Sequence, residues 1–166
     1  PLSPRINVNY AFAYLEARQY DLGIEIARRT LELDPTFSGT HEALAVGYTG
    51  KEMYPEALAE YQEEMRLAGE TEPNPYVGAA YARAGRLEEA RAILRHFESA
   101  QGDFGSVAMA VLYTSLGERE KAFAMLESAY AARNSALQNL KIEQGLDPLR
   151  NDPRFEDLVH RVGLPK

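Results

Sequence analysis

Hydrophobic residues recur every three or four positions along most of this chain, which is the spacing that places them on one face of an α-helix. The pattern predicts eight helices, over about residues 4–18, 20–33, 38–50, 54–68, 74–84, 87–99, 104–116 and 119–132. In the second helix, the residues expected to face inward are Leu22, Ile26, Leu31 and Leu33. The connections within successive pairs are short, so the two helices of each pair are expected to run antiparallel.

Proline and glycine mark the predicted helix ends. Ser3–Pro4 provides an N-cap followed by a proline in the first turn. Asp34–Pro35 ends the second helix, because proline cannot continue a helix and restrains the residue before it. Gly50, Gly85 and Gly117 lie in the turns inside pairs, where glycine reaches the left-handed backbone conformation without strain.

One pattern occurs four times in these helices: a tyrosine, a small residue nine positions later, and an apolar or small residue four positions after that. The instances are Tyr14…Gly23…Ala27, Tyr48…Ala57…Tyr61, Tyr81…Ala90…Leu94 and Tyr113…Ala122…Leu126. The small residues lie 34, 33 and 32 positions apart. A fixed period in this range predicts stacked helix pairs. The small residues are expected at helix crossings, with the tyrosines filling the space beside them.

Residues 134–166 depart from the repeat. A short helix is predicted over Leu137–Ile142, and Gly145–Pro148 is expected to break it. A last helix is predicted from Asp152, as its N-cap, to about Val162. Its buried face is expected to consist of Phe155, Leu158 and Val159. This tail is expected to cap the fourth helix pair, because an open repeat end exposes apolar surface.

Residues 4–132 resemble the tetratricopeptide repeat, a 34-residue helix–turn–helix with small residues at the helix crossing and a proline after the second helix. Besides the four tyrosines and the small residues of the second helices, the matches are Pro35 and the small residues Ala11, Ala45, Gly78 and Ala110 in the first helices. The usual tryptophan is replaced by Asn7, His41, Asn74 and Ser106. The resemblance implies an all-α, right-handed superhelix of four pairs, at about 4–35, 38–69, 73–100 and 104–132. The pairs fill a region 1–133, and the cap fills 134–166.

The resemblance also implies a non-enzymatic scaffold that binds a protein or peptide in a concave groove lined by the first helices. Carried onto this sequence, the groove-facing positions are Val8, Phe12, Glu42, Val46, Tyr76, Ala79, Val107 and Val111. Such a largely apolar surface suits an amphipathic helix or an extended apolar peptide. The alternative is that many of these residues pack between neighbouring repeats.

Chaperone-binding members of the family clamp a C-terminal carboxylate with Lys, Asn and Arg. The corresponding positions here hold Val8, Phe12, Ala43, Glu72 and Tyr76, so binding of chaperone tails is not expected.

The tail segment 140–165 is similar to the ends of tetratricopeptide arrays in large bacterial regulators, behind kinase, adenylate-cyclase-like or winged-helix domains. This likeness implies a cytoplasmic signalling protein. It also raises a second hypothesis, a regulatory module that docks its own effector domain. The chain begins with Pro1 rather than Met, so either a piece of a longer polypeptide or a processed chain is expected.

Composition and motifs argue against other functions. The net charge of -7 disfavours direct binding to nucleic acid, which needs a basic surface. There are no cysteines, which excludes disulfides, cysteine-based zinc sites and a cysteine nucleophile. No apolar run approaches membrane-spanning length, so no membrane association is expected. His41, His96 and His160 stand alone in the sequence, without metal-ligand spacing. We therefore expect no catalytic residues, no metal and no cofactor.

Two surface features complete the expectations. The acidic runs Glu63–Glu64 and Glu88–Glu89 are expected on solvated outer faces of second helices. Apolar groove and end surfaces also make a homodimer a hypothesis to test.

Overall fold

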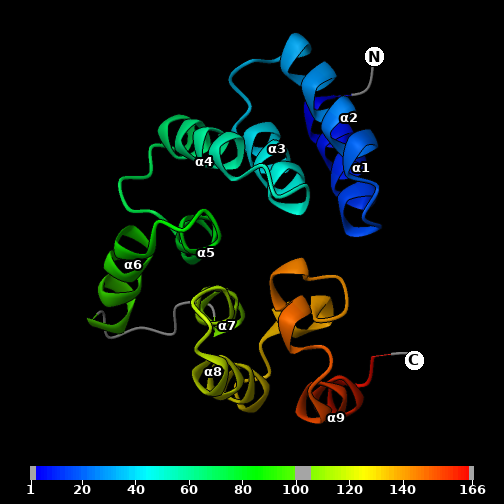
Figure 1. Cartoon of the computed structure of the whole chain (residues 1–166). Coiled ribbons are helices and arrows are strands. Elements are labelled where there is room, and N and C mark those ends of the chain that lie inside the picture. Colours follow the sequence, from blue (N-terminus) through cyan, green and yellow to red (C-terminus); the bar gives the residue numbers. More distant parts are fainter. Residues whose placement is uncertain (1–2, 100–105, 165–166) are drawn as a thin grey trace. The chain divides into compact units, whose positions relative to one another are not determined.

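The computed structural model describes residues 3–99 and 106–164, which form an all-α fold without a strand in these ranges. The helices are α1 (Pro4–Glu16), α2 (Tyr20–Leu33), α3 (Ser38–Gly50), α4 (Tyr54–Ala68), α5 (Pro75–Arg83), α6 (Leu87–Ser99), α7 (Ser106–Ser115), α8 (Arg119–Ala131) and α9 (Pro153–Val162), with 3₁₀ helices η1 (Ser135–Asn139) and η2 (Gln144–Leu149) (Figure 1). All eight long helices and the last helix expected from the sequence are present. The predicted positions 100, 104 and 105 lie outside the described residues.

The chain divides into two compact units, an N-terminal unit of Pro1–Pro73 and a C-terminal unit of Asn74–Lys166. In the N-terminal unit, α1 pairs with α2 and α3 pairs with α4, while α3 also packs against α1 and α2. In the C-terminal unit, α5 pairs with α6 and α7 pairs with α8, while α7 also packs against α5 and α6. Each unit therefore consists of sequential helix pairs, as expected of a helical repeat.

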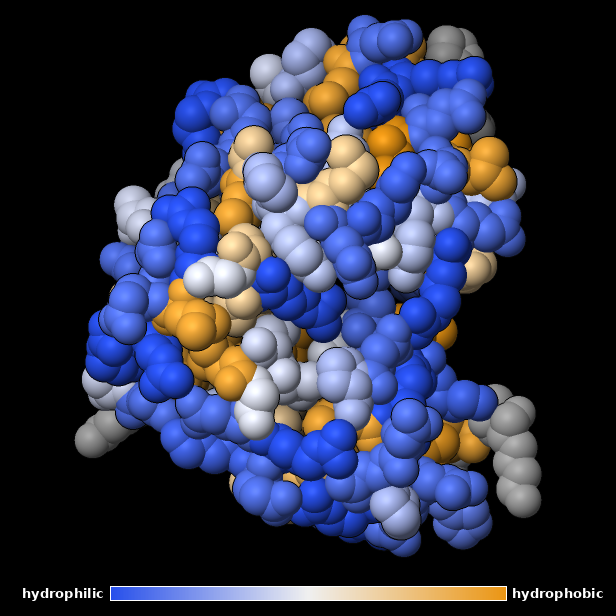
Figure 2. Space-filling model, in the orientation of Figure 1, coloured by the Kyte–Doolittle hydropathy of each residue, from blue (hydrophilic) through white to orange (hydrophobic). Residues whose placement is uncertain are grey.

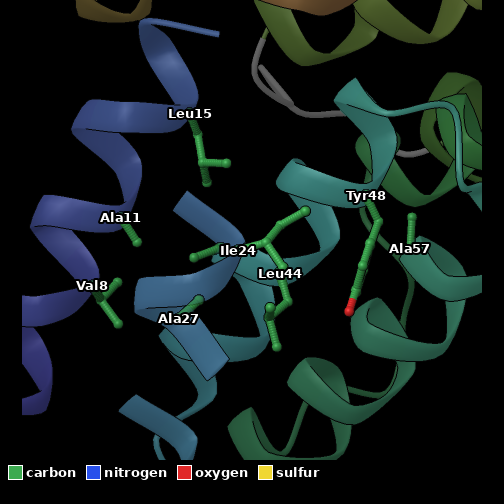
Figure 3. Close-up of a cluster of buried hydrophobic side chains, with 9 residues drawn as sticks. Val8, Ala11, Leu15, Ile24, Ala27, Leu44, Tyr48 and Ala57 are labelled. Atoms are coloured by element: carbon green, nitrogen blue, oxygen red, sulfur yellow. The ribbon is translucent and has the colours of Figure 1, made fainter. Parts of the chain in front are cut away.

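The core of the N-terminal unit lies between its two pairs. Val8, Ala11 and Leu15 of α1 point toward Ile24 of α2 and Leu44 of α3 (Figure 3). Each of these side chains is at most 6% exposed. Buried alanines make this packing possible, because they let helix backbones approach closely.

The nine-residue spacing between tyrosine and small residue has a cause in the backbone. The carbonyl oxygens of Tyr14, Tyr48, Tyr81 and Tyr113 accept hydrogen bonds of 2.8–2.9 Å from the N–H five residues later. The residue that donates this bond accepts one from the small residue four positions further on, at 3.0–3.2 Å. The two hydrogen bonds span five and four residues, which together give the nine-residue spacing. The spacing therefore results from a helix end that is followed directly by the first turn of the next helix.

The small residues are buried as expected: Ala57, Ala90 and Ala122 have no exposed surface, and Gly23 is buried. The tyrosines are expected to fill the space beside the helix crossings, and burial confirms this for two of them. Tyr48 and Tyr113 are 6% and 5% exposed, whereas Tyr14 and Tyr81 are half-buried. Tyr81 instead stacks with the Arg86 guanidinium, whose carbon lies 4.6 Å from the ring centre.

The turn glycines are confirmed at Gly85 and Gly117, whose φ angles are 77° and 78°. The expectation for Gly50 is wrong, because Gly50 is the last residue of α3 and the left-handed residue of that turn is Glu52, with φ of 60°. Arg18 holds the same position in the first pair, also at 60°. The conformation is required by the turn, and these two pairs adopt it without glycine.

Two residues of α2 that the sequence predicts to face inward are exposed instead. Leu22 is 46% exposed and Leu33 is 56% exposed, whereas α2 buries Gly23, Ile24, Ala27 and Thr30. The buried face follows the small residues, because the neighbouring helix crosses there. Leu22 and Leu33 lie off this buried face and are turned toward solvent.

The tail continues the spacing of the array. η2 packs on α7, and α9 packs on α8. Arg154 and Arg161 of α9 each form two hydrogen bonds with the carboxylate lying 34 residues earlier, on Glu120 and Glu127. The expected break at Gly145–Pro148 is wrong, since both residues belong to η2. η2 and α9 thus take the places of the first and second helices of a fifth, incomplete pair.

The last helix follows the prediction more closely. Asp152 is its N-cap, and its Oδ1 accepts a hydrogen bond of 3.0 Å from the Arg154 N–H. Phe155 and Leu158 are buried, and Val159 is half-buried. By contrast, the Ser3 side chain makes no capping hydrogen bond at the start of α1.

Candidate binding surface

The eight positions expected to line a groove differ widely in exposure. Four are buried, with at most 5% of their surface exposed: Val8, Ala79, Val107 and Val111. Phe12, Val46 and Tyr76 are half-buried, and Glu42 is exposed. The buried four pack inside their units, so they offer no surface to a partner in this structure.

In the C-terminal unit, two of the expected groove positions, Tyr76 and Val111, contact the chain's own tail. Gly145 of η2 contacts the side chain of Val111 so closely that a methyl group there would overlap it. Tyr76 donates a hydrogen bond of 3.4 Å from its hydroxyl to Glu143 Oε2. Arg83 of α5 donates from Nη2 to the Gly145 carbonyl at 3.3 Å.

In the N-terminal unit, the remaining positions form one accessible face. Phe12 and Val46 occupy the same repeat position, 34 residues apart, on α1 and α3, and these two helices pack together. Both side chains rest partly on the core cluster. Glu42 lies one helical turn before Val46 on α3, so it belongs to the same face. We call Phe12, Glu42 and Val46 the α1–α3 face.

Negative charge gathers beside this face. The pKa of the Glu42 carboxyl is raised by desolvation, and then by the charge of Glu70. The pKa of Glu64 is also raised, first by burial and then by the charges of Glu42 and Glu70, while His41 acts in the opposite direction. Neither the Glu42 nor the Glu64 carboxylate forms a salt bridge with a Lys or Arg within the described ranges. Oε2 of Glu64 is buried and has no hydrogen-bond partner in those ranges. Glu42, Glu64 and Glu70 therefore form a cluster of negative charge with which no Lys or Arg of the described ranges forms an ion pair.

His41 lies in the same helix pair and is 8% exposed. Its Nδ1 is 2.7 Å from Oε2 of Glu60 on α4, a pairing across 19 residues that the sequence did not reveal. With the proton on Nδ1, the ring donates to Glu60, and Nε2 is left as an acceptor without a partner in the described part of the chain. His41 is therefore a buried residue paired with Glu60, whereas His96 and His160 are exposed.

The surface chemistry is mixed rather than apolar. Figure 2 shows hydrophobic residues in several separate groups among polar ones on the face in view. Within residues 3–99 and 106–164, no group of three His, Cys, Asp or Glu side chains is arranged to hold a metal ion. In the same ranges, no helix combines the length and the hydrophobicity needed to cross a membrane. The α1–α3 face can thus offer apolar contact and negative charge to a ligand.

No protein-family model matches the chain, and no curated protein matches it. The likeness to the tetratricopeptide repeat therefore depends on the repeat spacing and on the packing of the helix pairs.

Proposed function

We propose that this chain is a protein-interaction module of the tetratricopeptide type, which binds a peptide or helix without catalysis. The sequential helix pairs, the small residues at the crossings and the common turn geometry support the repeat type. The observation that carries the binding role is the α1–α3 face, where two half-buried apolar side chains lie beside uncompensated carboxylates.

The chemistry of this face favours a ligand with apolar and basic side chains. Phe12 and Val46 expose only part of their surface, so they offer a shallow contact for a leucine or phenylalanine. A lysine or arginine beside that residue would approach Glu42, Glu64 and Glu70. Since the charge of Glu70 raises the pKa of Glu42 and the charges of Glu42 and Glu70 raise that of Glu64, a bound cation would relieve this repulsion. The preformed helices would lose little conformational entropy on binding.

The test compares two fluorescent amphipathic helical peptides that share a leucine face and differ only in charge. One carries lysine beside the leucines and the other carries glutamate. We expect the basic peptide to bind in an anisotropy titration and the acidic one to bind far more weakly. Binding of the basic peptide should weaken with added salt, because part of its affinity is electrostatic.

Two variants locate the site. Glu42→Lys should abolish most of the preference for the basic peptide, and Phe12→Asp should weaken binding of both peptides. Glu56→Lys is the matched control, because Glu56 is an exposed glutamate in the first turn of α4 and forms no ion pair in the described structure. Equal losses for Glu42→Lys and Glu56→Lys would point to a general charge effect and contradict this site.

A further inference from the structure

Helix α1 has apolar residues on two opposite sides. Val8, Ala11 and Leu15 point into the core of the N-terminal unit (Figure 3). Ile6, Tyr10, Ala13 and the C-cap Ala17 follow one another at helical spacing on the other side, and all four are exposed. Ile6 is 42% exposed and Tyr10 is 54% exposed. We call these four residues the outer stripe of α1.

The same repeat positions are covered in the next pair. The residues 34 positions after Ile6, Tyr10 and Ala13 are Thr40, Leu44 and Gly47 of α3, and all three are buried. A Cβ at Gly47 would lie 2.6 Å from Ile24 Cγ1 and 3.1 Å from Leu15 Cδ2. The first helix pair therefore covers this side of α3.

The C-terminal unit repeats this arrangement. Leu112 of α7 holds the position of Ala13 and has no exposed surface. It packs toward α5, where a Cβ at Gly78 would lie 3.1 Å from Leu112 Cδ1. Both units thus use this side of a first helix for packing against another helix. In α1, nothing in the described part of the chain covers it.

The outer stripe is complementary to itself. Its bulky residues, Ile6 and Tyr10, lie toward the start of α1, and its small residues, Ala13 and Ala17, lie toward the end. If two copies of α1 run antiparallel around a two-fold axis, Ile6 faces Ala17 and Tyr10 faces Ala13 of the second copy. Large side chains then meet small ones along the whole contact, as close packing requires.

The charges beside the stripe fit the same arrangement. Arg5 and Glu16 flank the stripe on one side, near opposite ends of α1. Both are exposed, and neither has a partner within residues 3–99 and 106–164. An antiparallel pairing places Arg5 of one copy near Glu16 of the other, and the two-fold axis makes this pair twice.

We propose that the outer stripe of α1 is the contact surface of a symmetric, antiparallel dimer of this chain. The proposal is independent of the peptide-binding function, because it uses neither Phe12 nor Glu42. One helix packed against one helix is a small interface. The dimer is therefore weak and forms with rising protein concentration.

Analytical ultracentrifugation of the whole chain, from micromolar to millimolar concentration, tests the dimer. We expect a reversible monomer–dimer equilibrium. Ala13→Arg should make the chain monomeric throughout, because it places a charge at the centre of the contact. Ala59→Arg, at an exposed position on α4, is the matched control and should dimerise like the parent. A parent chain that stays monomeric, or an Ala13→Arg variant that still dimerises, would overturn the proposal.

Charge reversal tests the antiparallel geometry. Arg5→Glu and Glu16→Arg each replace two attractive contacts with two repulsive ones, which should weaken dimerisation roughly tenfold. A mixture of the two variants should form a heterodimer, because every contact between them is attractive again. If the mixture associates no better than either variant alone, the antiparallel arrangement is wrong, whatever other surface holds the copies together.

Discussion

Gly145 packs against the side chain of Val111, with no room between them for a methyl group. This contact holds η2 on α7, and it occupies positions where the sequence indicated a groove. The neighbouring hydrogen bond from Arg83 to the Gly145 carbonyl extends the contact to α5. The second unit therefore covers part of its expected binding surface with its own tail.

Replacing Gly145 with alanine should destabilise the C-terminal unit. The added methyl group overlaps Val111, whose branched side chain has few alternative rotamers. We expect a loss of about 1–3 kcal/mol in the free energy of unfolding, measured by urea denaturation. Val111→Ala removes the obstructing methyl groups, so adding it to Gly145→Ala should cost less than the sum of the two single changes. Additive losses would show that the two side chains do not collide.

Glu52→Gly and Gly85→Ala, both at left-handed turn positions, should change the free energy of unfolding in opposite directions. Glu52 holds a left-handed backbone at φ of 60°, which costs about 1–2 kcal/mol for a residue other than glycine. Glu52→Gly should therefore raise the free energy of unfolding by up to about 1 kcal/mol, after glycine's larger chain entropy in the unfolded state is subtracted. Gly85→Ala should lower it, although a Cβ there meets nothing within 4 Å. Thermal melts of both variants give the comparison, and a shift in the same direction for both would refute it.

Acid should weaken the attachment of α9. Hydrogen bonds from the Arg154 side chain and then from its backbone N–H lower the pKa of Asp152 from 3.8 to about 2. A carboxyl whose pKa is lowered by folding stabilises the native state above its unfolded pKa. This stabilisation is complete above about pH 4 and is lost as the pH falls through 2.

The matched variant is Asp152→Asn, which keeps an N-cap side chain but removes the charge that faces Arg154 and Arg119. We expect its melting temperature to vary less with pH between 4 and 2 than that of the parent chain. Equal pH dependence of the two proteins would assign the acid sensitivity to other carboxyls, such as that of Glu120.

Glu64→Gln should stabilise the N-terminal unit at neutral pH. Burial and the charges of Glu42 and Glu70 raise the Glu64 pKa, so folding favours its protonated form. For a raised carboxyl pKa, native stability falls as the pH rises above the unfolded value of 4.5. The glutamine variant should melt higher than the parent at pH 7 and close to it at pH 4. Glu56→Gln, on the exposed first turn of α4, should leave both values unchanged.

The sequence by itself determined the helices and their order. Their hydrophobic spacing and their turn residues are local properties, and the Tyr-to-small spacing records two backbone hydrogen bonds that lie close together along the chain. The burial of Ala57, Ala90 and Ala122 followed from the same repeat. Such features can be predicted because the interactions that cause them join residues a few positions apart.

Only the tertiary structure decided which faces of those helices stay exposed. Val107 and Val111 read as groove residues in the sequence, yet they are buried in the C-terminal unit, where η2 packs on α7. Leu22 and Leu33 read as core residues, yet the crossing of α2 with its neighbours turns them outward. The pairing of His41 with Glu60 was equally hidden, because the two lie on different helices. Exposure depends on what packs against a residue from elsewhere in the chain, and local spacing carries no record of that.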